Sequence, residues 1–129
     1  RDLALEAVYK ALYSADERYR SIAAQLLGGL KDKKGLLKTL QDDDSRVRKN
    51  SALAIGAAGL SDLASALTLK LNDPDWRVRA AVAEGLKRLK NPDVIGSLQA
   101  RHRVESHPVV LGSIEHALLS LSKLLNQSN

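Results

Sequence analysis

The stretch 73-DPDWRVRAAVAEGL-86 decides the fold of this 129-residue chain. Counted from Val78, its apolar and small residues recur at offsets of 0, 4, 7 and 8, which is the spacing of one face of an α-helix. A similar stretch, 42-DDDSRVRKNSALAIGAAG-59, stands 31 residues earlier, with Val47 in the place of Val78. Repetition at this period indicates an architecture of stacked helical units.

Two further copies appear when the same frame is carried along the chain. Downstream, Val110 takes the reference position, and upstream Tyr19 takes it. We therefore predict a single domain over 1–129 that contains four repeats. Their approximate bounds are 1–31, 32–60, 61–90 and 91–125.

Each copy is predicted to hold two helices, a short first helix and a longer second helix that begins near the reference position. The apolar segments expected to form the first helices are 3–12, 36–40, 63–71 and 94–100. No segment alternates apolar and polar residues as a half-buried strand would. We expect an all-α fold of eight helices in four hairpins, stacked as a right-handed α-solenoid because one hairpin cannot bury its apolar face alone.

Helix starts are predicted from capping residues and first-turn prolines. The candidates are Ser14 with Glu17 as a capping box, Asp73-Pro74, Asn91-Pro92 and Ser61-Asp62.

The motif Asp-x-x-Val-Arg, followed by an alanine-rich amphipathic helix at a period near 30 residues, resembles the HEAT-repeat family. More narrowly, it is similar to the short HEAT-like repeats of phycobilisome (bilin) lyases. The likeness extends over essentially the whole chain and is strongest over 42–89. It implies a ladder of hydrogen bonds between an Asp and the second Arg of successive repeats. Carried over, it assigns as acceptors and donors Asp16, Asp44, Asp75, Arg20, Arg48 and Arg79.

A buried carboxylate–guanidinium pair fixes the angle between neighbouring repeats, so we interpret these residues as structural. The arginines before the valine, Arg46 and Arg77, are expected to face water. The fourth copy carries His107 and Leu111 where the inner copies carry Asp and Arg, which suits a terminal repeat.

The 20 basic and 15 acidic residues give a net charge of +5, which raises the possibility of nucleic-acid binding. Many acidic residues stand at predicted helix starts and many basic ones at helix ends, as the helix dipole favours. The remaining cations could form a basic rim. They lie in 31–38 and at Lys87, Arg88, Lys90, Arg101 and Arg103.

The sequence gives no sign of an active site. It has no Cys, its three His lack metal-ligand spacing, and no glycine-rich phosphate loop is present. We expect no enzyme activity, no cofactor, no metal and no small-molecule substrate. With no signal-peptide pattern and no apolar run near the length of about 20 residues that spans a bilayer, we expect a cytoplasmic protein without membrane association.

The resemblance implies that partners bind the concave face, lined by the second helices. Counted from the reference valine, the positions expected to be exposed there are offsets 2, 6 and 9. With Trp76, a packing plug or a partner contact, the candidates are Lys49, Leu53, Gly56, Ala80, Glu84 and Lys87. Leu53 is the expected apolar anchor of a shallow groove.

We therefore predict a non-enzymatic scaffold that binds another protein on this face. The first alternative is a nucleic-acid-binding module that uses the basic rim. The second, which rests on the resemblance, is a subunit of a bilin lyase-like complex.

Overall fold

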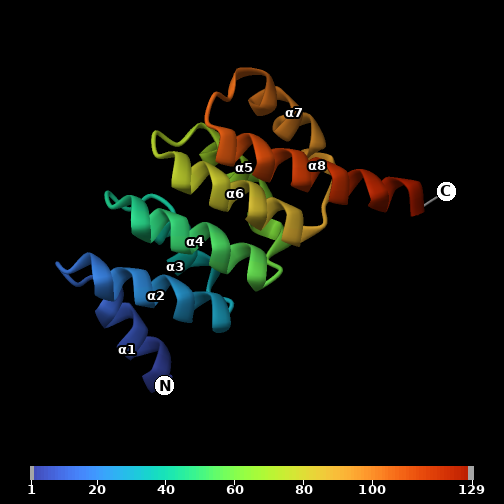
Figure 1. The fold of residues 1–129 in the computed structure, drawn as a ribbon. Helices are drawn as coiled ribbons and strands as arrows, with labels where there is room; N and C mark the ends of the chain where they lie inside the picture. The colour runs from blue at the N-terminus through green and yellow to red at the C-terminus, as the bar shows by residue number, and fades with distance from the viewer. Residues whose placement is uncertain (1, 128–129) are drawn as a thin grey trace.

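The computed structural model describes residues 2–127 and is helical throughout that range, with no strand (Figure 1). The first helices of the four hairpins are α1 (Leu3–Leu12), α3 (Lys33–Thr39), α5 (Ala64–Leu69) and α7 (Ile95–Val104). The second helices are α2 (Glu17–Gly29), α4 (Ser45–Ala57), α6 (Trp76–Leu89) and α8 (Pro108–Gln127). Short 3-10 turns η1 (Ser61–Leu63), η2 (Lys70–Asn72) and η3 (Pro92–Val94) flank α5 and precede α7.

The second helices stack side by side in one layer, α2 on α4, α4 on α6 and α6 on α8, with the other helices behind or beside them (Figure 1). This is the predicted right-handed α-solenoid. The core lies between the layers and is aliphatic. Val47, Val78 and Val110 are fully buried at the reference position, whereas Tyr19 at the same position of the first repeat is exposed.

Glycines let neighbouring second helices approach closely. A Cβ on Gly56 would lie 2.6 Å from the Cα of Gly85, and a Cβ on Gly28 would lie 2.9 Å from the Cβ of Ala54. The prediction that Gly56 is exposed for partner binding is therefore wrong, because α6 covers this position. Gly28, at the same offset in the first repeat, is buried in the same way against α4.

Helices α2 and α6 begin two residues later than the predicted caps Ser14 and Asp73 imply. Asp16, Asp44 and Asp75 are the N-cap residues, and each carboxylate accepts from the backbone N–H two residues further on. The capping box at Ser14 is wrong, since Ser14 instead accepts from the N–H of Asp16 at 3.1 Å. Asp73 likewise precedes the true cap and is not one.

The predicted starts of the third and fourth first helices had opposite outcomes. Asn91 is confirmed as the N-cap of η3, where its side chain accepts from the N–H of Asp93, and Pro92 follows it. Ser61 and Asp62 lie inside η1, and Leu60 before them makes no side-chain cap, so this part of the prediction is wrong.

Three second helices end on a residue in the left-handed region. Lys31, Gly59 and Lys90 stand at equivalent positions after α2, α4 and α6, with φ of 54°, 66° and 55°. After α2 and α4, two backbone hydrogen bonds close a Schellman motif, one of them from the N–H of Asp32 to the carbonyl of Leu27 at 2.9 Å. A lysine in this conformation is strained where glycine is not.

Replacing Lys90 with glycine is expected to raise the free energy of unfolding by about 1 kcal/mol, because a Cβ at positive φ is costly. Urea denaturation followed by circular dichroism measures the change. The matched control is Lys34→Gly, inside α3, which should lower stability by about 0.5–1 kcal/mol. Destabilisation by both variants would show that the left-handed conformation carries no strain.

Helix α8 departs from the expectation that no apolar segment is long enough to cross a membrane. Its 20 residues are long and apolar enough to do so by length and composition alone. One face of α8 packs into the core through Val110, Ile114, Ala117 and Leu121. Core helices of soluble proteins meet the same criterion, so the finding carries little weight by itself.

Candidate functional site

Successive repeats are joined by a buried arginine–carboxylate contact. Arg48 on α4 donates from Nε to Asp73 Oδ2 at 2.8 Å and from Nη2 to Asp73 Oδ1 at 3.0 Å. Its Nη1 donates to the carbonyl oxygens of Asp42 and Asp43 at 2.9 and 3.0 Å. All three nitrogens therefore hold the turn before α4 against the turn before α6.

The same arrangement recurs at the other two junctions. Arg20 donates to both oxygens of Asp42 at 2.9 and 3.2 Å, and Arg79 to both oxygens of Glu105 at 2.7 and 3.0 Å. We refer to these three bidentate pairs as the ladder. In each pair, the acceptor carboxylate also accepts a hydrogen bond from the backbone N–H two residues further on. The carboxylate therefore lies next to the start of the following second helix.

The predicted acceptors of the ladder are wrong. Asp16, Asp44 and Asp75 use their carboxylates as N-caps and pair with Arg18, Arg46 and Arg77 on their own helices. The true acceptors lie two residues before the N-cap position, at spacings of 31 and 32 that match the repeat. They are Asp42, Asp73 and Glu105.

Glu105 is the one ladder acceptor that is not an aspartate, and it stands in the fourth copy, which departs from the aspartate motif. Its side chain is fully buried and also accepts from Arg101 Nε at 3.1 Å. The hydrogen bonds from Arg79, and then those from the His107 N–H and Arg101, lower the pKa of Glu105 to about 2 against the desolvation that opposes them. The Glu105 carboxylate, which pairs with both Arg79 and Arg101, thus joins the fourth repeat to the third.

The stability of the chain is expected to fall as the pH drops from about 4.5 toward 2. The pKa of Glu105 is 4.5 in an unfolded reference and about 2 in the folded chain, so its contacts stabilise above pH 4.5 and are lost below it. In Glu105→Gln, thermal denaturation across this range should show a weaker pH dependence. The control is Glu115→Gln, on the exposed side of α8, whose pH profile should match that of the unsubstituted protein.

The arginines expected to face water do so, although they are not free. Arg77 pairs with Asp75 at 3.1 Å, and Arg46 pairs with Asp44 at 3.0 Å. Arg46 also reaches Glu17 of the first repeat at 3.0 Å. These exposed pairs contribute little to stability compared with the buried ladder.

Trp76 spans the junction of the third and fourth repeats. Its ring stacks on His107, with 4.1 Å between ring centroids and 9° between planes. His107 Nδ1 also accepts from the Val109 N–H at 3.2 Å, so the imidazole stands where the other second helices have an aspartate cap. Trp76 remains 37% exposed, which leaves one edge of the stack at the surface.

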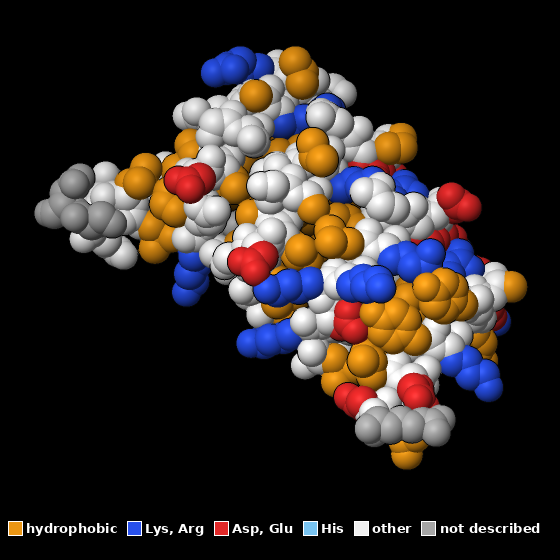
Figure 2. Space-filling model, turned by 180° about the vertical axis from the view of Figure 1, so that it is seen from behind, with side chains coloured by type: hydrophobic (Ala, Val, Ile, Leu, Met, Phe, Trp, Pro, Cys, Tyr) orange, Lys and Arg blue, Asp and Glu red, His pale blue; other side chains and the backbone are white. Residues whose placement is uncertain are grey.

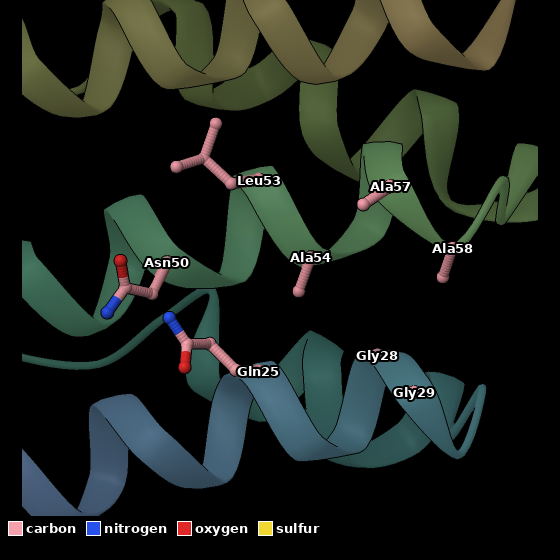
Figure 3. A pocket seen from close by; sticks show the side chains of 8 residues that line it. All are labelled: Gln25, Gly28, Gly29, Asn50, Leu53, Ala54, Ala57 and Ala58. Atoms are coloured by element: carbon pink, nitrogen blue, oxygen red, sulfur yellow. The ribbon is translucent and has the colours of Figure 1, made fainter.

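A groove runs between α2 and α4 on the second-helix layer, and it is the best candidate for a partner-binding site. Its deeper part has a volume of about 320 Å³. Glycines and alanines of both helices form the floor. The lining residues, shown in Figure 3, are Gln25, Gly28, Gly29, Asn50, Leu53, Ala54, Ala57 and Ala58.

The amides of Gln25 and Asn50 point toward one another across this groove, whereas Leu53 rises from α4 on the side that faces α6 (Figure 3). A second hollow of about 330 Å³ shares Asn50 and lies toward the helix starts. It is lined by charged and polar side chains. They are Glu17, Arg18, Ser21, Arg46 and Lys49, with Ile22. The whole groove therefore runs from a charged end, past two amides, to an apolar end.

The structure brings together only two of the predicted partner-binding residues, since Lys49 and Leu53 both line the groove. Ala80, Glu84 and Lys87 lie on α6 outside it, and Glu84 forms ion pairs with Lys87 and Arg88. The sequence analysis missed Gln25 and Asn50. Gln25 stands at offset 6 of the first repeat, equivalent to Leu53, but the candidates were taken from the inner copies alone. Asn50 stands at offset 3, and only the packing of α2 beside α4 sets the two amides opposite each other.

Comparison with known proteins agrees with this geometry. A family model described as HEAT repeats matches residues 5–69 and 34–119. The chain therefore belongs to the HEAT-repeat family, which the ladder and the stacked hairpins also indicate. No curated protein sequence matches the chain.

Among solved structures, the chain is similar to the complex of CpcE and CpcF of phycocyanin lyase from Nostoc sp. PCC7120. The identity is 26% and the TM-score is 0.71, over 92% of this chain and 54% of that chain. The present chain thus spans about half the length of its structural relative.

Proposed function

We propose that this protein is an interaction scaffold that binds an extended segment of another protein in the groove between α2 and α4. The observation that carries the proposal is the pair of facing amides of Gln25 and Asn50. In the part of the chain that the structure describes, neither makes a side-chain hydrogen bond. Each offers a donor and an acceptor, which is what a peptide backbone requires.

The side chains at the two ends of the groove indicate which residues the bound segment carries. Lys49 at one end has no ion-pair partner among residues 2–127, so it is available to a carboxylate. Leu53, Ala54 and Ala57 offer apolar surface toward the other end. The helix rises about 12 Å between Lys49 and Ala57, which an extended chain covers in about four residues. The segment therefore carries an acidic residue roughly four positions from an apolar one.

The proposal predicts which substitutions weaken binding. Peptides selected from a random library on the purified protein should lose affinity about tenfold or more with Leu53→Glu and with Lys49→Glu, measured by fluorescence anisotropy. The matched control is Leu69→Glu, an exposed leucine on α5 in the other layer, which should bind normally. Equal affinity for all four proteins would contradict the proposed site.

A second candidate function is a subunit of a bilin lyase-like complex. The fold similarity to the complex of CpcE and CpcF supports it. The chain spans only about half of that relative, so the whole protein's activity does not transfer with the fold. Incubating the purified protein with a bilin and recording its absorbance would reveal a bound pigment through a shifted and sharpened band.

Nucleic-acid binding has less support. On the face seen in Figure 2, apolar and acidic side chains separate the Lys and Arg side chains, so they form no continuous basic surface. Several cations of the predicted rim already have carboxylate partners. The pairs are Lys33 with Asp62, Lys87 and Arg88 with Glu84, and Arg101 with Glu105.

A further inference from the structure

The outer edge of the first repeat carries an apolar stripe. Tyr19, Ile22, Leu26 and Leu30 lie along one face of α2 at a spacing of three, four and four residues, and each is between 43% and 56% exposed. No second helix covers this side of α2, which lies at the end of the layer (Figure 1). We call these four residues the α2 stripe.

In the other three repeats, most of the equivalent positions are buried against the preceding repeat, and Asn50, Ala58 and Ser113 are half-buried. The reference valines and Leu121 are fully buried, and Leu89 is nearly so. On α1, Ala7 is the equivalent of Gly35, a position that faces Leu27 of the repeat before it, and Ala7 is exposed. Within residues 2–127, the α2 stripe therefore lacks the neighbouring repeat that covers most of the equivalent positions elsewhere.

A further repeat stacked in the usual way does not fit the α2 stripe. At the other junctions the position of Leu26 is occupied by a small residue, Ala54, Gly85 or Ala117, which permits close approach of the helices. The ladder acceptor is also absent, because Ser14 stands where Asp42 and the other acceptors stand.

Stacking the C-terminal edge of one copy on the N-terminal edge of another fails for related reasons. Leu111 replaces the ladder arginine on α8. Leu119 would meet Leu26, whereas every other junction has a small residue, Ala54, Gly85 or Ala117, on at least one side. Glu115 would enter the junction where the other second helices have a fully buried alanine. A carboxylate buried there without a partner is costly.

We propose that the α2 stripe is a homodimer interface, in which two copies pair edge to edge about a two-fold axis. The stripe is nearly symmetric about its midpoint, so in an antiparallel pair Tyr19 lies opposite Leu30 of the second copy and Ile22 opposite Leu26. This self-complementarity is what an isologous interface requires. Residues 21–30 contain no charged side chain, which matches the depletion of charge in interface cores.

The size of the edge suits a weak dimer. The four side chains of the stripe expose on the order of 100 Å² each, so two copies bury about 800 Å² of apolar surface through them. This is below the roughly 1,000 Å² of a stable interface and is typical of a transient one. The dimer should therefore dissociate on dilution.

Sedimentation equilibrium of the purified chain over a dilution series tests the proposal. We expect a mass of twice 14.0 kDa at high concentration and a concentration-dependent fall toward the monomer. Leu26→Glu, or Leu30→Glu if the first does not fold, should be monomeric throughout with an unchanged helical circular dichroism signal. Leu119→Glu, at an exposed site on α8, should dimerise like the unsubstituted protein.

Other outcomes would overturn the proposal. A chain that is monomeric at every concentration has no such interface. Oligomers that keep growing with concentration and are lost in Leu119→Glu would show head-to-tail stacking instead. Ile22 also lines the charged end of the groove between α2 and α4, so the decisive variants are at Leu26 and Leu30, which line neither part of the groove. The stripe is assayed without any peptide.

Discussion

Replacing Asp73 with alanine is expected to lower the free energy of unfolding by about 3–5 kcal/mol. The carboxylate is 2% exposed and accepts two hydrogen bonds from Arg48, whose own side chain is 12% exposed. Its removal leaves a guanidinium buried without its charge partner and frees the N–H of Asp75 at the start of α6. For a domain of ordinary stability, this is a large part of the total. Urea denaturation followed by circular dichroism measures the loss.

An exposed ion pair supplies the matched control. Lys33 and Asp62 also join neighbouring repeats, but their side chains are 48% and 73% exposed. Asp62→Ala should therefore change stability by no more than about 1 kcal/mol. Similar losses from Asp62→Ala and Asp73→Ala would show that burial does not set the strength of the ladder. In Arg48→Met/Asp73→Leu, much of the stability should return, because no unpaired charge remains.

Gly56→Ala is expected to cost about 2–3 kcal/mol, although alanine is the better helix former. The new Cβ would stand 2.6 Å from the Cα and 2.9 Å from the carbonyl oxygen of Gly85. Both are backbone atoms, so α4 and α6 must move apart and the leucines between the layers lose contact. The midpoint of urea denaturation gives the size of the effect.

The control for this substitution is Gly112→Ala on α8, where a Cβ meets nothing within 4 Å. It should raise stability by about 0.5–1 kcal/mol through helix propensity alone. A gain at both positions would mean that the approach of α4 and α6 is looser than described.

The repeat period and the helical offsets predicted the fold because residues at the same offset are buried in successive repeats. Val47, Val78 and Val110 recur at one position, and each of them is in the core. The two layers and the eight helices follow from that pattern. Ladder donors could also be placed, since an arginine follows the valine in the inner copies.

The ladder acceptors of the inner repeats were misplaced because the turns before α4 and α6 each offer aspartates at two positions. Asp42 and Asp44 differ only in what each carboxylate can reach: Asp44 caps its own helix, and Asp42 lies below the turn where Arg20 arrives. The equivalence of Asp42, Asp73 and Glu105 at the repeat spacing was a usable signal in the sequence.

The groove was predicted only in part. Leu53 stood out as an apolar residue at an offset expected to face water. Gln25 stands at the same offset in the first repeat and could have been selected, but Asn50 could not. The role of both amides depends on how α2 and α4 lie relative to each other. Helical periodicity within one repeat holds no information about that relation.

The most direct test of the account is to map where a bound peptide lies. A library-selected peptide should be titrated into the isotopically labelled protein while amide chemical shifts are followed by NMR. The account predicts that the largest changes fall at Gln25, Lys49, Asn50 and Leu53 and that α5 and α7 stay unperturbed. Changes centred on α5 and α7, or on the basic side chains at 31–38, would contradict the groove as the binding site.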